Sequence, residues 1–506
     1  MTYEQLLHID NISNLTEKEQ INIVGQLFDF SFDNQNIDGI QKSFSLIEQI
    51  KIDELSEVGK TNLFYDISNG WSYLRKLKYF QKSEAWSFQM EELTKEIYYL
   101  RKAISSIGFS EVQKERQCQI LTNLGNSFSF VGRFVEAQAY WNKAIEIIPL
   151  FSMAIGNKGY GLYHYGQILF DDSHKAIFYN HAYHYLKDAL KLKQFLEGDA
   201  ENGFRQLFDY IERTYEERLY TDKFDLNDFN LGDNPELFEY RNWCLSNKLY
   251  INPINDLGGY TNACHDCLNL SSIKIKIKSP PTFFSLYNQI KQEFATARYL
   301  LFNSTKKNET HFSDEDVVIL DTMETAIYSY NLEQVKLSFR ISYSILDKIA
   351  YLLNDYLHIG MALHKVSFRS IWQTKNKINS SFENSDNWAL RGLYWLSKDL
   401  YEIEFKEVIE PDAQEISKIR NHIEHKYLKV VESKQLYETM FDTNNDISYA
   451  IERGEFERKT FNLIKLVRAA IIYLSIAIDH EEKKKSKDEE SSLPLQLNEI
   501  PQWKKI

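Results

Sequence analysis

Cysteine is scarce in this 506-residue chain, which has four scattered cysteines. A secreted domain stabilised by disulfides would need more of them, so the content predicts a reducing compartment. The start, MTYEQLLHIDN, is polar and lacks the apolar segment of a signal peptide. The best candidate for a membrane span, residues 469–478, is too short. We therefore expect a cytoplasmic protein with no membrane partner.

Proline is also rare, and no proline lies between Pro281 and Pro411. Long proline-free segments with apolar residues every three or four positions indicate helices, so we predict an all-α fold. A group of prolines from Pro235 to Pro281 marks a junction. The predicted organisation is a helical repeat region at 1–234, a connecting segment at 235–282, a helical bundle at 283–480 and a charged flexible tail at 481–506.

Small and aromatic residues repeat in the N-terminal region at the spacing of a tetratricopeptide (TPR) unit. Gly125 and Ala137 are small enough for two helices to approach closely, while Trp141 fills the space beside them. Gly159 follows Gly125 by 34 residues, which is one repeat length. The alternative is an unrelated array of helical hairpins. Either arrangement forms a solenoid-like surface that suits a protein partner.

The connecting segment carries two weaker patterns. Alternating isoleucine and lysine from Ile273 to Lys278 predicts a short strand, whose lysines either bind an anion or, more commonly, face solvent. Cys264 and Cys267 have the spacing of half a zinc site, but the second pair is absent. Core or loop cysteines are the favoured interpretation, and we expect no metal or other cofactor.

The bundle region contains helical patterns at 337–357, 387–400 and 457–479. Asp347 is expected to face solvent, or alternatively to hydrogen-bond to the helix that carries the site described next. Tyr394 and Trp395 have helical spacing, which favours a place in the core over stacking on nucleic-acid bases.

One short motif brings catalytic residue types together. The helical-looking run EISKIRNHIEHKYLKVV contains Arg420, Asn421 and His425 in the pattern R-N-x3-H. Histidine suits proton transfer near neutral pH, and arginine binds phosphate through its planar fork. The alternative is a surface helix in which Arg420 and Glu424 form an ordinary ion pair and His425 is solvated.

Helix geometry limits what this motif does within one chain. Asn421 and His425 share a face, whereas Arg420 and His425 are separated by about 140° around the helix. Two copies facing each other would bring two arginines and two histidines to one phosphate. The motif therefore predicts a homodimer.

The motif and its surroundings, including YRNWCLSNKLYINPINDLGGY, SYSILDKIAYLLNDYL and NWALRGLYWLSKDL, resemble the HEPN superfamily, in the bacterial branch with a TPR-like N-terminal region. The likeness is good over residues 237–479. It implies a metal-independent endoribonuclease, used as a toxin or antiphage-defence effector, that leaves a 2′,3′-cyclic phosphate on RNA, with tRNA as one candidate. It implies Arg420, Asn421 and His425 as catalytic residues.

Three further residues have expected secondary roles at this site: His422 in catalysis, and Lys426 and Tyr427 in contacting substrate. Some superfamily members bind nucleotides without cutting RNA. The alternative function is thus a non-catalytic interaction module that recruits a protein through its repeats. The net charge of −13 argues against a large RNA-coating surface but allows a small basic site.

Overall fold

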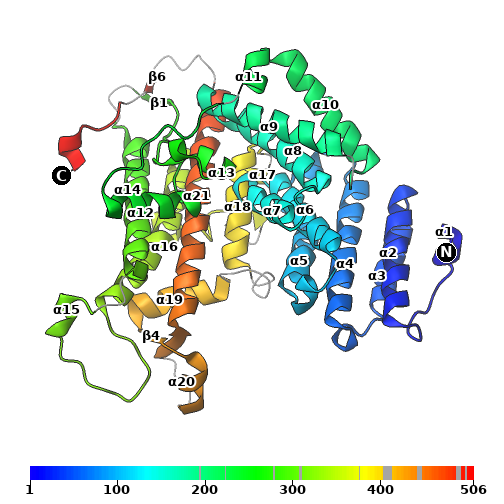
Figure 1. Cartoon of the computed structure of the whole chain (residues 1–506), viewed down its shortest axis with the longest axis horizontal. Helices are drawn as coiled ribbons and strands as arrows, with labels where there is room; N and C mark the ends of the chain where they lie inside the picture. Colours follow the sequence, from blue (N-terminus) through cyan, green and yellow to red (C-terminus); the bar gives the residue numbers. More distant parts are fainter. Residues whose placement is uncertain are drawn as a thin grey trace.

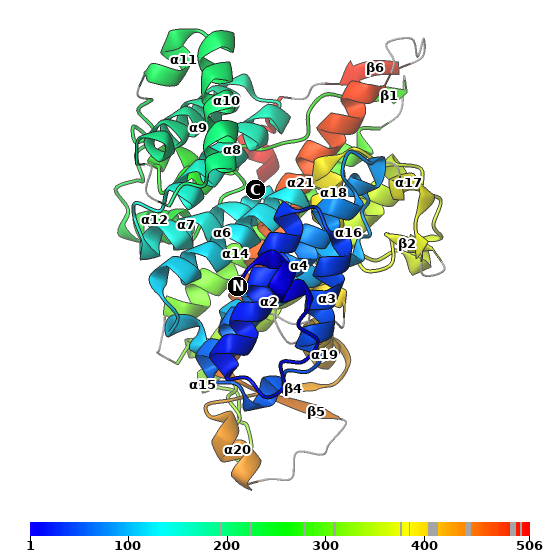
Figure 2. The same ribbon diagram turned by 90° about the vertical axis from the view of Figure 1, so that its right-hand side faces the viewer.

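The computed structural model describes residues 1–192, 195–222, 224–276, 280–306, 310–374, 377–383, 385–402, 413–440, 447–485, 492–495 and 498–505. Helices dominate this part of the chain, which confirms the all-α prediction (Figure 1). An N-terminal helical region lies beside a C-terminal helical bundle, and Figure 2 shows the same arrangement from the side.

The N-terminal region is a series of helices that pack against their neighbours in sequence, among them the pairs α4–α5, α6–α7 and α8–α9. Its helices are α1 (Tyr3–Leu7), α2 (Glu17–Asp33), α3 (Ile37–Ile47), α4 (Glu57–Lys78), α5 (Glu91–Ser105), α6 (Lys114–Phe130), α7 (Phe134–Ile147), α8 (Ser152–Ile168), α9 (Asp172–Leu192), α10 (Gly198–Thr214) and α11 (Glu217–Thr221). Short 3-10 helices η1 (Ile52–Glu54), η2 (Ser83–Trp86) and η3 (Ile107–Ser110) connect some of them.

The rest of the chain places long helices around α21 and adds short strands. Its helices are α12 (Pro235–Ser246), α13 (Ile254–Leu257), α14 (Thr282–Lys306), α15 (Phe312–Glu315), α16 (Tyr330–Tyr356), α17 (Ser380–Glu383), α18 (Trp388–Tyr401), α19 (Ala413–His425), α20 (Lys434–Met440) and α21 (Arg453–Lys484). Its strands are β1 (Ile273–Lys276), β2 (Gln373–Thr374), β3 (Lys377–Ile378), β4 (Tyr427–Val431), β5 (Ser448–Glu452) and β6 (Ser492–Leu495), and its 3-10 helices are η4 (Thr261–Ala263), η5 (Leu363–Lys365) and η7 (Gln502–Lys505).

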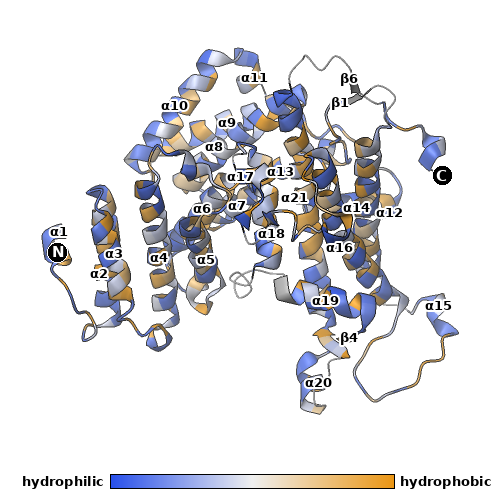
Figure 3. Cartoon of the chain, turned by 180° about the vertical axis from the view of Figure 1, so that it is seen from behind, coloured by the Kyte–Doolittle hydropathy of each residue, from blue (hydrophilic) through white to orange (hydrophobic). Residues whose placement is uncertain are grey.

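Helix α21 forms the centre of the bundle and packs against α14, α16 and α18. Figure 3 shows how hydrophobic this helix is compared with the outer helix α10. Among the described residues, α21 is the one helix long and apolar enough to cross a membrane, but 78% of its most apolar window is buried inside the protein. Its apolar character is therefore accounted for by its place in the core.

The close approach predicted for the helices around Gly125 is observed. A Cβ atom at Gly125 of α6 would lie 2.6 Å from Nε1 of Trp141 in α7, so only glycine fits. Trp141 is 1% exposed and donates a 3.0 Å hydrogen bond to Oδ1 of Asn126. The TPR-like assignment itself remains a prediction.

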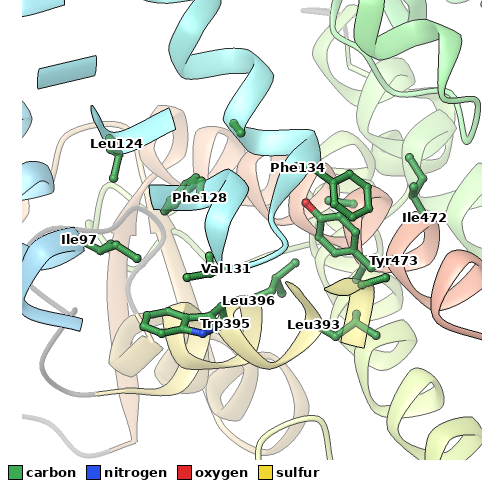
Figure 4. Packing of buried hydrophobic residues seen from close by; sticks show 14 of the residues in the cluster. Ile97, Leu124, Phe128, Val131, Phe134, Leu393, Trp395, Leu396, Ile472 and Tyr473 are labelled. Carbon is green, nitrogen blue, oxygen red and sulfur yellow. The ribbon is translucent and has the colours of Figure 1, made fainter. Parts of the chain in front are cut away.

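The N-terminal helices pack directly on the bundle (Figure 4). The ring of Phe134 in α7 contacts the ring of Tyr473 in α21 edge to face, with centroids 4.7 Å apart. Trp388 of α18 donates a 2.8 Å hydrogen bond from Nε1 to the carbonyl of Ser129. Gly132 lies so close to α18 that a Cβ would come within 2.0 Å of the Trp388 carbonyl oxygen. The two regions therefore share one hydrophobic core.

The strand predicted from Ile273 is present as β1, which pairs antiparallel with β6. Lys274 does not belong to a free lysine strip, because its Nζ donates to the Lys485 carbonyl at 2.9 Å. Ile277 and Lys278 lie outside the described residues. At the other end of the bundle, residues 481–484 of the expected flexible tail form the last turn of α21.

The motif run differs from the sequence prediction in its second half. The helix ends at His425, and Tyr427–Val431 forms strand β4 rather than continuing the helix. β4 pairs in parallel with β5, and Ala326 forms an antiparallel bridge to Val431 on its other side. Two adjacent valines favour an extended backbone, which explains why the helical periodicity stops here.

Candidate active site

Helix α19 carries the motif and is held on the bundle by an apolar stripe. Ile416 and Ile419 are fully buried, and Ile423 is partly buried against the same core. These residues occupy one side of the helix at helical spacing, so the polar motif residues must lie on its remaining faces. The helix packs against α16 and α18 and lies at one end of the bundle (Figure 1).

Arg420 lies at the edge of the buried stripe, over an aromatic ring. The centre of its guanidinium is 5.5 Å from the centroid of Tyr343 in α16, within cation–π range. Burial raises the pKa of the Tyr343 hydroxyl, so Tyr343 stays neutral beside Arg420. Within the described part of the chain, no carboxylate forms an ion pair with Arg420.

Glu424, one turn after Arg420, is bound elsewhere. Arg340 of α16 donates to its two carboxylate oxygens at 2.8 and 3.0 Å. The ion pair between Arg420 and Glu424 that the surface-helix interpretation requires is therefore replaced by a bridge between two helices. This bridge leaves the Arg420 guanidinium without a competing anion from its own helix.

Asp347 contributes negative charge near Arg420 without binding α19. Its Oδ1 accepts a 3.0 Å hydrogen bond from the backbone N–H of Phe368. Burial raises the pKa of the Asp347 carboxyl, and the hydrogen bond and the Arg420 charge act in the opposite direction. Asp347 is half-buried, so the expectation of a solvent-facing residue is wrong.

Asn421 and His425 are exposed and project from the same face of α19. Their spacing of four residues places them one above the other, as predicted from helix geometry. His425 is the last residue of the helix. Its ring is therefore accessible to a ligand approaching the end of the bundle.

His422, three residues before His425, is 6% exposed, whereas His425 is exposed. Its Nδ1 lies 2.7 Å from the Lys418 carbonyl oxygen, which only accepts, so Nδ1 carries the hydrogen and Nε2 is the remaining basic nitrogen. The ring packs near Tyr449 of β5, with centroids 5.6 Å apart. His422 therefore anchors α19 to the small sheet, and its ring is buried where the ring of His425 is exposed.

Lys426 and Tyr427, the expected substrate contacts, follow the helix directly. Lys426 is exposed, and Tyr427 shares a 2.5 Å hydrogen bond with the hydroxyl of Tyr328. Burial, and then this hydrogen bond, raises the pKa of Tyr427. Tyr394 and Trp395 are 2% and 1% exposed in α18, so they belong to the core as predicted.

The structure adds two residues that sequence reasoning missed. Arg340 and Tyr343 lie on α16, about 80 positions before the motif, and both contact α19. Neither belongs to a recognisable motif, since Arg340 is a half-exposed helical arginine and Tyr343 is one of 32 tyrosines. Covariation between the two helices is the signal that would identify such contacts.

The cysteine pair of the connecting segment has separate partners. Cys264 contacts the hydroxyl of Tyr250 at 3.0 Å, while the sulfur of Cys267 lies 4.0 Å from Nε2 of His174. Among the residues that the structure describes, no group of three or more His, Cys, Asp or Glu side chains is placed to hold a metal ion.

Together the motif residues offer one fixed cation, one exposed amide and one exposed imidazole. Arg420 lies at the rim beside α16, and Asn421 and His425 face solvent about one third of a turn away. These groups are the ones needed to bind a phosphate and move a proton. A single α19 presents them over a broad surface rather than around one point.

Comparison with known proteins gives a match in the C-terminal region. Residues 275–481 match the model of a family described as LA2681-like HEPN. The matched range contains the whole of α19 and its contacts on α16. No curated protein and no solved structure matches the chain.

Proposed function

From the premise that residues 275–481 form a HEPN domain of the LA2681-like family, we propose that this protein is a metal-independent endoribonuclease. The observation that carries the proposal is that the motif side chains on α19 are available to a ligand. Arg420 is free of carboxylate partners among the described residues, while Asn421 and His425 stand exposed beside it. A helix that served only structure would gain stability by pairing Arg420 with Glu424.

The proposed reaction needs one proton transfer in each direction. His425 of one subunit removes the proton of the ribose 2′-hydroxyl, and the 2′-oxygen attacks phosphorus. The bond from phosphorus to the 5′-oxygen breaks, and the His425 of the second subunit returns a proton to that leaving oxygen. Products are a 2′,3′-cyclic phosphate and a 5′-hydroxyl. Arg420 stabilises the charge on the phosphoryl oxygens, and Asn421 donates a hydrogen bond.

A homodimer completes this site, because one helix separates Arg420 from His425. Two α19 helices related by a two-fold axis would place both copies of the motif around a single phosphate. Cleavage of cellular RNA by such a dimer suits a toxin or antiphage-defence effector, with tRNA as one candidate target.

A second candidate function is a non-catalytic module in which the N-terminal helices bind a protein and the bundle dimerises or holds a nucleotide. The net charge of −13 favours this alternative, because broad RNA binding needs a positive surface. The two functions differ in a simple respect: only the first changes the covalent structure of RNA.

The deciding experiment incubates total RNA and purified tRNA with the protein in excess EDTA. Wild type is compared with His425→Ala, Arg420→Ala and the control His364→Ala, which removes an exposed histidine of the same domain. We expect cleavage by wild type and the control, and a loss of about 10² to 10⁴-fold in the other two. Equal cleavage by wild type and His425→Ala would refute the assignment. If none of the four proteins cuts RNA, even when expressed in cells, the binding-module function is favoured.

A further inference from the structure

We propose that Lys143, Lys158, Lys248 and Lys465 form a binding site for the phosphodiester backbone of RNA, at the seam between the N-terminal helices and the bundle. The four residues come from α7, α8, the turn after α12, and α21. None of them forms a salt bridge with any described residue. The inference rests on the proposed function for its ligand, but it concerns a different surface from α19.

The buried carboxylate of Asp256 fixes the elements of this seam. Arg468 of α21 donates to its Oδ1 at 2.6 Å, and the Tyr165 hydroxyl of α8 donates to Oδ2 at 3.0 Å. The Nζ of Lys248 donates to the Asp256 backbone carbonyl at 3.3 Å. Lys465 precedes Arg468 by three residues, so the two share one side of α21. Because Arg468 already neutralises the Asp256 carboxylate, the positive charges of the lysines around it are not balanced by this carboxylate.

Lys158 forms the floor of the site. Its side chain is buried, and Nζ donates to Oδ1 of Asn142 at 2.7 Å and to the Tyr185 hydroxyl at 2.6 Å. Asn142 and Lys143 are adjacent in α7, so Lys158 is bonded to the turn of α7 that carries Lys143. Burial, followed by the charge of Lys248, lowers the pKa of Lys158 to about 7.

The other lysines repel one another across the seam. Burial lowers the pKa of Lys465, and the charges of Lys143 and Lys248 lower it further. Burial also lowers the pKa of Lys248, and Arg468 adds to this while Asp256 and Glu146 oppose it. The charges that lower these two pKa values are those of Lys143, Lys248 and Arg468, and Asp256 and Glu146 oppose them at Lys248. Binding of an anion would reduce the electrostatic repulsion between these positive charges.

The shape and lining of the site favour a strand of RNA over a small enclosed ligand. Lys143 is exposed, and Lys465 keeps part of its side chain in solvent although its amine is desolvated, whereas a cavity of about 710 Å³ lies elsewhere, between α9 and the connecting segment. Aromatic rings accompany the lysines, with Nζ of Lys465 4.4 Å from the Phe461 ring and Nζ of Lys143 5.4 Å from the Tyr140 ring. Lysines interleaved with aromatic rings on an open surface suit single-stranded RNA.

The site also lies within reach of the candidate active site. Helix α21 begins at Arg453, next to β5, and Lys465 follows twelve residues later, about 18 Å along the helix axis. A short single-stranded RNA spans this length. The N-terminal helices thus supply part of the surface that holds the substrate, which gives them a role beyond binding a protein partner.

The test measures the affinity of a fluorescent single-stranded RNA for the full-length His425→Ala protein in EDTA, over a range of salt concentrations. The test variant adds Lys143→Gln and Lys465→Gln, and the matched control adds Lys18→Gln and Lys114→Gln, which remove two exposed lysines elsewhere. We expect the test variant to bind about tenfold more weakly and its salt slope to fall by about 1.4, or ~0.7 per lost phosphate contact. The control keeps wild-type values.

Two results would overturn the proposal. The first is an affinity and salt slope that match the control variant in a protein with an unchanged melting temperature. The second is stabilisation by inorganic pyrophosphate that the test variant loses while its RNA affinity stays unchanged, which would assign the site to a free phosphate ligand. Because binding is measured without cleavage, a wild type that binds at this site but cuts no RNA would remove only the nuclease proposal.

Discussion

Arg101 and Asp399 are 298 residues apart in the chain, yet their side chains form a buried pair with two hydrogen bonds of 2.8 and 2.6 Å. The side chains are 6% and 3% exposed. Arg133 also forms an ion pair with Asp399. The pair joins α5 of the N-terminal region to α18, the helix that precedes α19 in the chain. The N-terminal helices and the bundle are therefore coupled through charge as well as through apolar packing.

Removing the shared carboxylate should destabilise the protein strongly. Asp399→Asn removes the carboxylate that accepts two hydrogen bonds from the buried guanidinium of Arg101 and leaves Arg133 with Glu136 as its anion. We expect a loss of about 3 to 5 kcal/mol of unfolding free energy. Chemical denaturation measures the loss. Glu54→Gln is the control, since it removes an exposed pair with Lys51, worth about 0 to 1 kcal/mol. Equal losses for the two variants would contradict the coupling.

Two glycine-to-alanine substitutions should have opposite effects. Gly125→Ala forces a methyl group against Trp141, and we expect a cost of about 1 to 3 kcal/mol. Gly203→Ala in α10 meets no atom within 4 Å and should stabilise by about 0.5 to 1 kcal/mol through helix propensity. Thermal unfolding compares them. A neutral Gly125→Ala would mean that α6 and α7 are less tightly packed than the structure shows.

The stability of the protein should carry a pH dependence that originates at Lys158. Its pKa of about 7 in the fold lies below the value of 10.5 for a free lysine, so the unfolded chain binds the proton more tightly. The lowered pKa of Lys158 therefore reduces the unfolding free energy by its full amount below about pH 7. This reduction disappears as the pH rises towards 10.5.

Lys158→Met tests this dependence, because it removes the titrating amine. We expect the difference in unfolding free energy between the variant and wild type to change by about 3 kcal/mol between pH 7 and pH 9.5, with wild type gaining at the higher pH. Urea denaturation at several pH values gives both curves. A constant difference would show that Lys158 titrates normally.

Mixed dimers should reveal whether the active site is shared. A dimer of one wild-type and one His425→Ala subunit keeps only one of the two histidines that the proposed reaction uses as base and acid. A shared site therefore predicts a loss of about 10² to 10⁴-fold, as in the His425→Ala homodimer. Co-expression, followed by purification through two different affinity tags, isolates this species for the RNA cleavage measurement. About half of the wild-type activity would instead place all catalytic groups within one chain.

The sequence by itself determined the features that depend on local spacing. Apolar periodicity and the scarcity of proline predicted the helices, and the pairing of Gly125 with Trp141 followed from residue size. The R-N-x3-H pattern placed Asn421 and His425 on one face of a helix. The likeness to HEPN proteins, found in the same segments, agrees with the family match over 275–481. Each of these inferences uses residues a few positions apart.

Only the tertiary structure decided which groups surround the motif. It ended the helix at His425, paired Glu424 with Arg340, placed Tyr343 under Arg420 and turned His422 towards β5. It also gathered four lysines from four elements at one seam. Spacing along the chain reports which face of a helix a residue occupies, but not which distant residue that face meets. That choice is made by packing, where burial of apolar surface fixes the helices and the polar partners follow.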